Sequence, residues 1–341
     1  MATYYEDILS QPMSLRRCMA AQTPDVLERL AQLCARPWQQ VLFCGMGSSN
    51  YCAIPAVHYL AQCGRRASGV SASELLGFDM PALREDTLLV INSQSGESAE
   101  IVRLLRELPA GITVLAVSND ANSTLARAAA LCLLMDAEPE RSVTTRTYLD
   151  SLALCMLIAR VLCGEPAHTA VQQVLHAADA MELALADAPG LLRGMTDVLG
   201  TPPFVCLLGR GCNHTTACAG TLFLREVARH TAFCELCGEF RHGPMEMVEE
   251  GFHAVIAAAN DHTFALQCRL AQDIQSHGGK VVVIASQPVE GVPTILLPDV
   301  GPWLSPLLTI LPIQLYADHL AAVKGLEAGA FRWGGKITRI E

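Results

Sequence analysis

Four side chains that can bind an anion are gathered in one short stretch, Ser93-Gln94-Ser95-Gly96-Glu97-Ser98. An apolar run at 88–91 precedes the stretch, and apolar residues at helical spacing follow it, which predicts a turn from a buried strand into a helix. At such a turn the unpaired backbone N–H groups and the positive end of the helix dipole favour an anion. A serine that merely caps the helix would explain only one of these residues, so the pattern favours a phosphate site.

A second region, 220–248, contains residue types that transfer protons. Glu226 lies in a segment with helical spacing of apolar residues, and His242 follows in a polar turn closed by Gly243-Pro244. Considered alone, Glu226 and His242 are each most simply interpreted as exposed side chains. Together with a phosphate site they suit chemistry on a sugar phosphate, because a carboxylate can move a proton between adjacent carbons and an imidazole can open the ring.

The elements that must position these residues alternate between short apolar strands and helices. We expect strands within 41–50, near 70, and at 88–92, 113–119 and 131–136, then again at 204–211, 253–260, 280–286 and 294–299. Helical patterns occupy most of 1–40, then 148–163, parts of 168–199, and a last long helix at about 304–324. This alternation predicts an α/β fold with parallel sheets.

The two halves of the chain repeat one another at a distance of about 165 residues. Gly45-Met46-Gly47 matches Gly209-Arg210-Gly211, and the strands that follow match in the same order. Only the first copy has the serine-rich turn, so we expect the phosphate site there. Both Gly-x-Gly turns lack the third glycine of a dinucleotide fingerprint, with Asn50 and His214 at that position, and predict no nicotinamide cofactor.

Composition limits the partners and the compartment. The 341 residues carry a net charge of −10 and no block of Lys and Arg, which argues against nucleic acid and anionic membranes. We expect neither a signal peptide nor a membrane span, and hence a cytoplasmic protein. Its 14 cysteines are expected to be free thiols. The one Cys-x-x-Cys, Cys234–Cys237, lacks the four ligands of a structural zinc site, and no metal or other cofactor is expected.

Two motifs carry a family resemblance that extends over nearly the whole chain. The serine turn resembles the Ser-Gln-Ser-Gly-Glu-Thr phosphate motif of the sugar isomerase (SIS) family. Glu239-Phe240-Arg241-His242-Gly243-Pro244 resembles the Glu-Leu-Lys-His-Gly-Pro motif in the isomerase half of glucosamine-6-phosphate synthases. The resemblance implies two SIS domains, each a parallel sheet flanked by helices (flavodoxin-like), with a C-terminal tail. The implied ranges are 1–165, a helical connector at 166–200, 201–325 and a tail at 326–341. The amidotransferase domain of those synthases is expected to be absent.

The resemblance also implies which residues hold the ligand. The phosphate would be held by the serine turn, the sugar or its phosphate by the turn after the first strand, and a further loop would close over the substrate. The implied residues are, in that order, Ser93, Gln94, Ser95 and Ser98; Ser48 and Ser49; and Thr144 and Thr145.

Three catalytic roles follow from the same resemblance. Glu226 takes the place of the carboxylate that moves a proton between C1 and C2. His242 takes the place of the ring-opening histidine, which in the family often comes from the neighbouring subunit, so we expect a homodimer or a higher homo-oligomer. Lys336 falls where the synthases have a tail lysine that forms a Schiff base with the open ketose, and an exposed tail residue is the alternative.

One departure from the synthases directs the functional prediction. Phe223 stands where they have a lysine three residues before the catalytic glutamate, and a phenyl ring can neither hold Glu226 ionised nor handle an amine. The Glu239-Phe240 pair is similar to that of deglycases that split phosphorylated fructosamines. We therefore expect a deglycase or deaminase that acts on an amine-bearing 6-phosphosugar. An aldose–ketose phosphosugar isomerase and a non-catalytic sugar-phosphate sensor are the alternatives.

Overall fold

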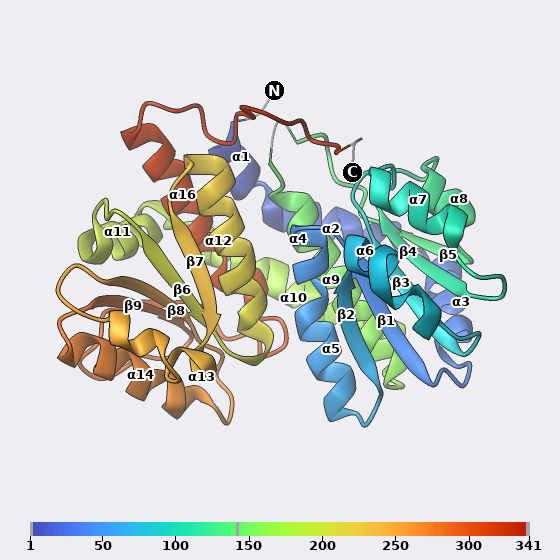
Figure 1. Ribbon diagram of the computed structural model, residues 1–341, viewed down its shortest axis with the longest axis horizontal. Coiled ribbons are helices and arrows are strands. Elements are labelled where there is room, and N and C mark those ends of the chain that lie inside the picture. The colour runs from blue at the N-terminus through green and yellow to red at the C-terminus, as the bar shows by residue number, and fades with distance from the viewer. Residues whose placement is uncertain (1–2, 141–142, 339–341) are drawn as a thin grey trace. The chain divides into compact units, whose positions relative to one another are not determined.

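The computed structural model describes residues 3–140 and 143–338, which form two compact units (Figure 1). The first unit comprises Ser10–Glu140, Thr144–Ala178 and the described residues from Arg332 onward. The second unit consists mainly of Asp179–Phe331, together with α1 (Tyr4–Leu9). Helix α10 (Ala167–Leu185) contains the point at which the chain passes from the first unit to the second.

The first unit is built on a sheet of five parallel strands in the order β2-β1-β3-β4-β5. The strands are β1 (Gln40–Gly45), β2 (Ala67–Ser71), β3 (Thr87–Asn92), β4 (Thr113–Ser118) and β5 (Leu131–Leu134). Every residue of β3 is buried, as expected for the central strand of a sheet covered on both faces. Gly45 pairs with Asn92 in the register of β1 and β3, so these two strands end side by side.

Helices cover both faces of this sheet. One face packs against α6 (Ala72–Glu74), the single-turn helix Leu75–Asp79, α7 (Ala99–Glu107) and α8 (Thr124–Ala128). On the other face lie α3 (Pro24–Cys34), α4 (Ser48–Tyr51), α5 (Ala53–Gln62) and α9 (Arg146–Leu162). Helix α2 (Gln11–Ala21) packs on α9, and a short 3-10 turn spans Met80–Ala82. All 17 residues of α9 are buried, which fits a helix that is apolar nearly all round.

The second unit has a sheet of five parallel strands in the order β10-β9-β8-β6-β7. Its strands are β6 (Val205–Gly209), β7 (Ala232–Leu236), β8 (His253–Ala257), β9 (Lys280–Ala285) and β10 (Thr294–Leu296). Numbered along the chain, each sheet therefore has the strand order 2-1-3-4-5. The two halves share one topology, although only one of them has the serine-rich turn.

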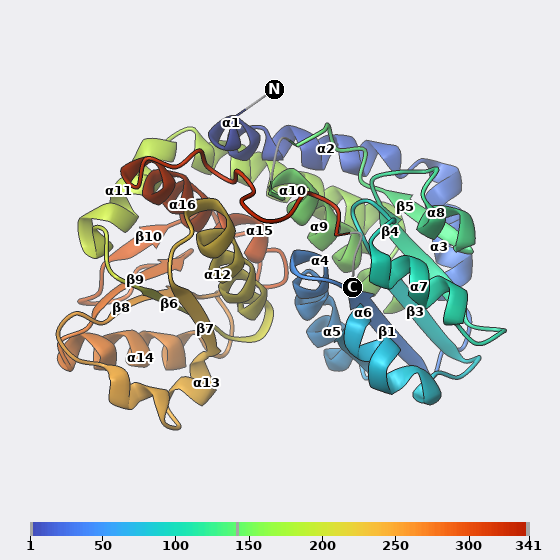
Figure 2. The same cartoon turned by 45° about the horizontal axis from the view of Figure 1, so that its top comes forward.

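In the second unit α13 (Cys237–Phe240) and α14 (Phe264–Ser276) cover one face of the sheet, and α11 (Ala188–Leu199), α12 (His214–Ala228) and α16 (Leu311–Val323) cover the other (Figure 2). Short helical turns at Gly211–Asn213, Pro244–Met247 and α15 (Pro306–Thr309) complete the unit. The window Pro306–Val323 is long and apolar enough to cross a membrane by length and composition alone, and 78% of it is buried inside the protein. Such burial is typical of a core helix.

The predicted α/β fold with parallel sheets is confirmed, with two differences in its elements. Strand β7 was not predicted: its apolar run Ala232–Cys234 is only three residues long before Glu235, and only Ala232 of its five residues is buried. The single long helix predicted for 304–324 is two helices, α15 and α16, which meet at Ile310 just before Pro312. A proline cannot donate to the preceding turn, which explains the break.

Candidate functional site

The serine turn joins β3 to α7 at the carboxyl edge of the first sheet. Ser98 occupies the N-cap position of α7, but its side chain makes no capping hydrogen bond. Ser93 and Ser95 brace the turn, because their hydroxyls accept from the N–H groups of Gly96 and Glu97, each at 3.2 Å. Gln94, Ser95 and Ser98 are half-buried. Helix capping does not account for Ser98, and its hydroxyl can serve a ligand at the helix N-terminus.

The turn is held in one shape by its neighbours. Gly96 has φ +62°, and a Cβ added to it would lie 2.6 Å from the Cβ of Ser123, so no other residue fits without a shift. The backbone N–H of Asn119 donates to the carbonyl of Gln94 at 2.9 Å. The side chain of Glu97 accepts from the Thr124 hydroxyl at 3.0 Å and so ties the turn to the start of α8. The donors are therefore pre-organised before any anion binds.

A second polar turn, after β1, lies beside the serine turn. Ser48 and Ser49 begin the short helix α4, directly after Gly47, whose φ is +52°. The Asn92 side chain donates to the carbonyl of Ser49 at 2.8 Å, which links the end of β3 to this turn. The strand order of the sheet reverses between β1 and β3. Open α/β sheets bind ligands at such a switch point, outside the carboxyl ends of the strands.

Sequence reasoning did not single out Glu140, the most extensively bonded carboxylate of the first unit. Its side chain has no exposed surface. One oxygen accepts from the Thr145 N–H at 2.9 Å, the Thr145 hydroxyl at 3.0 Å and the Thr147 N–H at 3.0 Å. The other accepts from the Thr147 hydroxyl at 2.8 Å and from Lys336 Nζ at 3.1 Å. Glu140 thus joins the start of α9 to the C-terminal tail.

The two threonines assigned to the closing loop differ in what they can reach. Thr145 is fully buried and its hydroxyl is engaged by Glu140, whereas Thr144 is half-buried and shares a hydrogen bond of 2.7 Å with the Thr147 hydroxyl. Lys336 is neither free in solvent nor deeply buried: its side chain is 29% exposed and ion-paired with Glu140. Close by, the tail carbonyl of Thr338 accepts from the N–H of Ala99, the first residue of α7. The tail therefore lies against the helix that the serine turn begins.

Glu226 lies in the last turn of α12, in the second unit. No described residue forms a hydrogen bond or an ion pair with its carboxylate. Glu226 is exposed, yet the protein around its carboxyl group removes enough water to raise the pKa of Glu226 to about 7. A carboxylate with this pKa can both accept and return a proton near neutral pH.

His242 is exposed and follows α13 by two residues, with its N–H donating to the carbonyl of Glu239 at 2.8 Å. It does not lie near Glu226 within the second unit. Arg225 donates to the carbonyl of Ala232 at 2.8 Å, which fixes the last turn of α12 at the start of β7, whereas His242 comes after the end of that strand. Figure 1 shows the last turn of α12 and helix α13 at opposite ends of β7.

Phe223, which stands in place of the family lysine, is fully buried. Leu224 and Val227 are 1% exposed and belong to the same apolar face of α12. The ring of Phe223 therefore packs in the core and leaves Glu226 without a neighbouring cation at that position.

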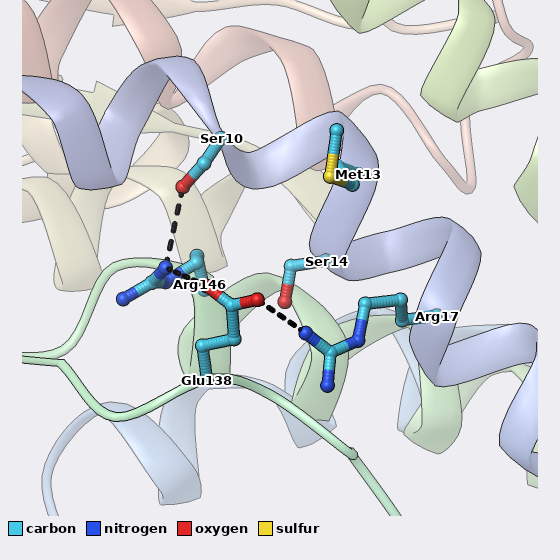
Figure 3. A pocket seen from close by; sticks show the side chains of 6 residues that line it. All are labelled: Ser10, Met13, Ser14, Arg17, Glu138 and Arg146. Carbon is cyan, nitrogen blue, oxygen red and sulfur yellow. Dashed lines mark hydrogen bonds and ion pairs between the residues drawn. The ribbon is translucent and has the colours of Figure 1, made fainter.

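A small hollow of the first unit is lined by Ser10, Met13, Ser14, Arg17, Glu138 and Arg146 (Figure 3). Glu138 pairs with both guanidinium groups of the lining, with Arg17 at 2.6 Å and with Arg146 at 3.7 Å, and Arg146 also donates to the Ser10 hydroxyl at 3.4 Å. The hollow's volume of about 20 Å³ is far below the range of about 300–1,000 Å³ common for ligand pockets. The ion pairs and the hydrogen bond around this hollow fasten α2 to the segment before α9.

A second hollow lies at the opposite, amino edge of the first sheet. Its lining includes Arg65, Arg66 and Arg84, with Asp86 as the acidic member. Arg65 and Arg84 donate to backbone carbonyls, and Arg66 is exposed. A cluster of guanidinium groups can attract anions, so this hollow is the natural competitor of the serine turn in any binding experiment. Within the described residues, no group of three or more His, Cys, Asp or Glu side chains could hold a metal ion.

Comparison with known proteins places these features in a family context. Residues 36–160, which include β1–β5 and the serine turn, match the SIS domain family. The chain is 28% identical over 320 residues to an isomerizing glutamine–fructose-6-phosphate aminotransferase of Zymomonas mobilis, with 89% of this chain and 52% of that protein covered. The chain thus spans about half the length of the curated relatives it matches.

Solved structures share the fold over almost the full chain. The C-terminal domain of glucosamine-fructose-6-phosphate aminotransferase from Francisella tularensis superposes with a TM-score of 0.84 at 22% identity, covering 96% of this chain and 98% of that one. Glucosamine-6-phosphate deaminase from Thermotoga maritima superposes with a TM-score of 0.76 at 18% identity, covering 99% of this chain and 100% of that one.

Proposed function

We propose that this chain, which contains a SIS domain and is homologous to the isomerase domain of glutamine–fructose-6-phosphate aminotransferases, acts at C1–C2 of an amine-bearing 6-phosphosugar. It would work as a deglycase or deaminase that releases the amine and a hexose 6-phosphate. The observation that carries the proposal is the serine turn. Its backbone is fixed by neighbouring loops, and Ser98 stands at a helix N-terminus without capping it.

The reaction needs one proton shuttle and one water. The serine turn and the Ser48-Ser49 turn hold the phosphate, so that the open sugar chain is oriented. On a ketose with its amine at C1, Glu226 removes a proton from C1 and returns it to C2, while the C2 oxygen gains a proton and the nitrogen loses one, so that the C1 amine becomes an imine. On an aldose with its amine at C2, the proton moves from C2 to C1 and the imine forms at C2. Water then adds to the imine, the C–N bond breaks, and the amine leaves. The pKa of Glu226, raised to about 7, supports this use as base and then as acid.

The buried ring of Phe223 supports a reaction that removes an amine rather than delivering one. With Phe223 at that position no lysine side chain holds Glu226 ionised, and burial raises its pKa. Lys336 would act on the open ketose as a Schiff-base lysine, and its pairing with Glu140 would hold the side chain in the tail until substrate arrives.

The separation of Glu226 and His242 along β7 supports an assembly of at least two chains. If His242 opens the ring of the sugar on which Glu226 acts, it must come from another copy, because the two residues lie at opposite ends of one strand. We therefore include a homodimer in the proposal. A single chain would then lack a ring-opening group.

The test is to incubate the protein with fructoselysine 6-phosphate, glucosamine 6-phosphate and fructose 6-phosphate and to follow products by NMR. The proposal predicts release of an amine from one of the first two. Turnover of fructose 6-phosphate alone would replace it by a plain aldose–ketose isomerase, which needs the same shuttle. E226Q should reduce the rate by about 10²–10⁴-fold; binding of all three sugars with no turnover by the unmodified protein would indicate a sensor.

A further inference from the structure

Two cysteines from different elements of the second unit bring their sulfur atoms together. Cys218 of α12 and Cys234 of β7 are both half-buried, and their Sγ atoms lie 3.8 Å apart. The Cys-x-x-Cys spacing in the sequence pairs Cys234 with Cys237 instead. Cys237 is only 2% exposed in the core, and burial raises the pKa of its thiol to about 12. The structure thus gives Cys234 a partner that the sequence spacing does not indicate.

The surface of α12 that faces β7 provides a polar setting for this pair. His214, Cys218, Thr221 and Arg225 follow one another at intervals of three or four residues and so share one side of the helix. At one end His214 Nε2 lies 3.4 Å from the Cys218 sulfur. At the other end Arg225 donates to the Ala232 carbonyl at 2.8 Å and fixes helix to strand.

This setting separates the roles of the two thiols. The hydrogen bond with Cys218, the Thr221 hydroxyl and the charge of Arg225 lower the pKa of the Cys234 thiol to about 7, against the opposing effects of burial and Glu235. The same hydrogen bond and burial raise the pKa of Cys218. Near neutral pH a large fraction of Cys234 is therefore thiolate while Cys218 stays a thiol, and the thiolate is the nucleophile of cysteine chemistry.

We propose that Cys218 and Cys234 form a redox site that closes to a disulfide on reaction with a hydroperoxide. The Cys234 sulfur attacks the peroxide, so that an S–O bond forms, the O–O bond breaks and water or an alcohol leaves. The sulfur of Cys218 then attacks the sulfenic acid: the S–S bond forms, the S–O bond breaks, and the departing hydroxide takes the Cys218 proton and leaves as water. Two thiols lose two electrons, and the peroxide gains them.

The experiment treats the reduced full-length protein with hydrogen peroxide, blocks the remaining thiols with N-ethylmaleimide, and maps the peptides by mass spectrometry. The expected result is a cross-link between the peptides of Cys218 and Cys234, reversed by dithiothreitol. C237S is the matched control and should keep this cross-link, while C218S and C234S should lose it. In C218S the Cys234 sulfenic acid should be trapped by dimedone.

Other outcomes would overturn the proposal. A dominant cross-link between Cys234 and Cys237, or oxidation of exposed Cys63 while both Cys218 and Cys234 stay reduced, would show that the pair is not the reactive site. Loss of the cross-link in C218S supports the proposal only if the variant folds. Circular dichroism therefore checks its fold, and C218A is tested as a second variant. The readout is a covalent bond and does not depend on the sugar-phosphate activity.

Discussion

At the scale of single residues, the structure separates side chains that look alike in the sequence. Glu140 and Glu226 are both glutamates with an arginine next to them in the sequence, yet Glu140 accepts five hydrogen bonds and Glu226 accepts none from any described residue. The role of Glu226 was predicted because the same chain also contains His242 and a phosphate motif. Nothing in the sequence around Glu140 indicates that the tail, 196 residues further on, folds back onto it.

Glu226 should make the stability of the fold depend on pH. Its pKa of about 7 in the folded protein lies above the ordinary value of 4.5, so the folded state keeps a proton that the unfolded state has lost between these two values. The carboxyl therefore costs increasing stability as the pH rises from 4.5 to about 7 and a constant amount above that. E226Q removes this cost, so its Tm should equal that of the unmodified protein at pH 4.5 and exceed it at pH 8.

Scanning calorimetry at both pH values checks this expectation, with E239Q as the control because Glu239 is an exposed carboxylate of the same unit. An equal Tm difference for E226Q at both pH values would show that the Glu226 carboxyl is not desolvated in the folded protein.

At the scale of elements, most strands that the sequence predicted have buried residues on both faces, although β2 was predicted and has no buried residue. The buried runs of β3, β8 and β9 are visible in the sequence because they are short apolar segments bounded by polar or turn residues, whereas the longer apolar run of α9 is helical. Strand β7 lies at the sheet edge with one fully buried residue, and no local pattern marks it. The sequence predicted polar turns at the strand ends. It could not predict that the loop Ser118–Thr124 holds the serine turn in one shape, because these contacts join residues far apart in the sequence.

The serine turn should be intolerant of a side chain at Gly96. G96A adds a Cβ at φ +62°, which costs about 1–2 kcal/mol for any L residue, and places it 2.6 Å from the Ser123 Cβ. The matched control is G64A, at φ +73° with no atom within 4 Å of the new Cβ. Urea unfolding should show a larger loss for G96A than for G64A, and only G96A should weaken sugar-phosphate binding in calorimetric titration. Equal losses in both assays would contradict a braced turn.

Glu140 should contribute more than Lys336 to the free energy of unfolding. E140Q replaces a buried charged acceptor of five hydrogen bonds, and we expect the free energy of unfolding to fall by about 1.5–3 kcal/mol. K336A removes one partly exposed ion pair and should cost less than about 1 kcal/mol. Denaturant unfolding measures both, and limited proteolysis should cut the tail faster in both variants. A loss for K336A as large as that for E140Q would mean that Glu140 does not anchor the α9 segment by itself.

At the scale of the whole molecule, two units of the same strand order carry different site chemistry. In the first unit the turn after β3 has serines at the N-terminus of α7, where we propose that the phosphate binds; in the second the matching turn after β8 has Asp261, whose carboxylate accepts from the Thr263 N–H at 2.7 Å. The sequence repeat predicted this asymmetry from residue types alone. It did not predict that His242 and Glu226 lie at opposite ends of β7, because that strand was not recognised in the sequence.

The proposed sharing of one site between two chains predicts the activity of mixed assemblies. E226Q and H242N should each be nearly inactive alone. In a heterodimer of the two, one of the two sites keeps both Glu226 and His242, so an equal mixture with free subunit exchange should regain about a quarter of the unmodified activity. Native mass spectrometry verifies the exchange. Verified heterodimers without any recovered activity would place both residues in the site of a single chain.

The central claim is that the serine turn of the first unit binds the phosphate of a sugar, and a crystal soaked with fructose 6-phosphate tests it most directly. We expect the phosphorus atom to lie beyond the N-terminus of α7, with its oxygens within hydrogen-bond distance of Ser95 or Ser98 and of backbone N–H groups in 93–98. A phosphate found instead among Arg65, Arg66 and Arg84 at the opposite edge of the sheet, with the serine turn empty, would contradict the account.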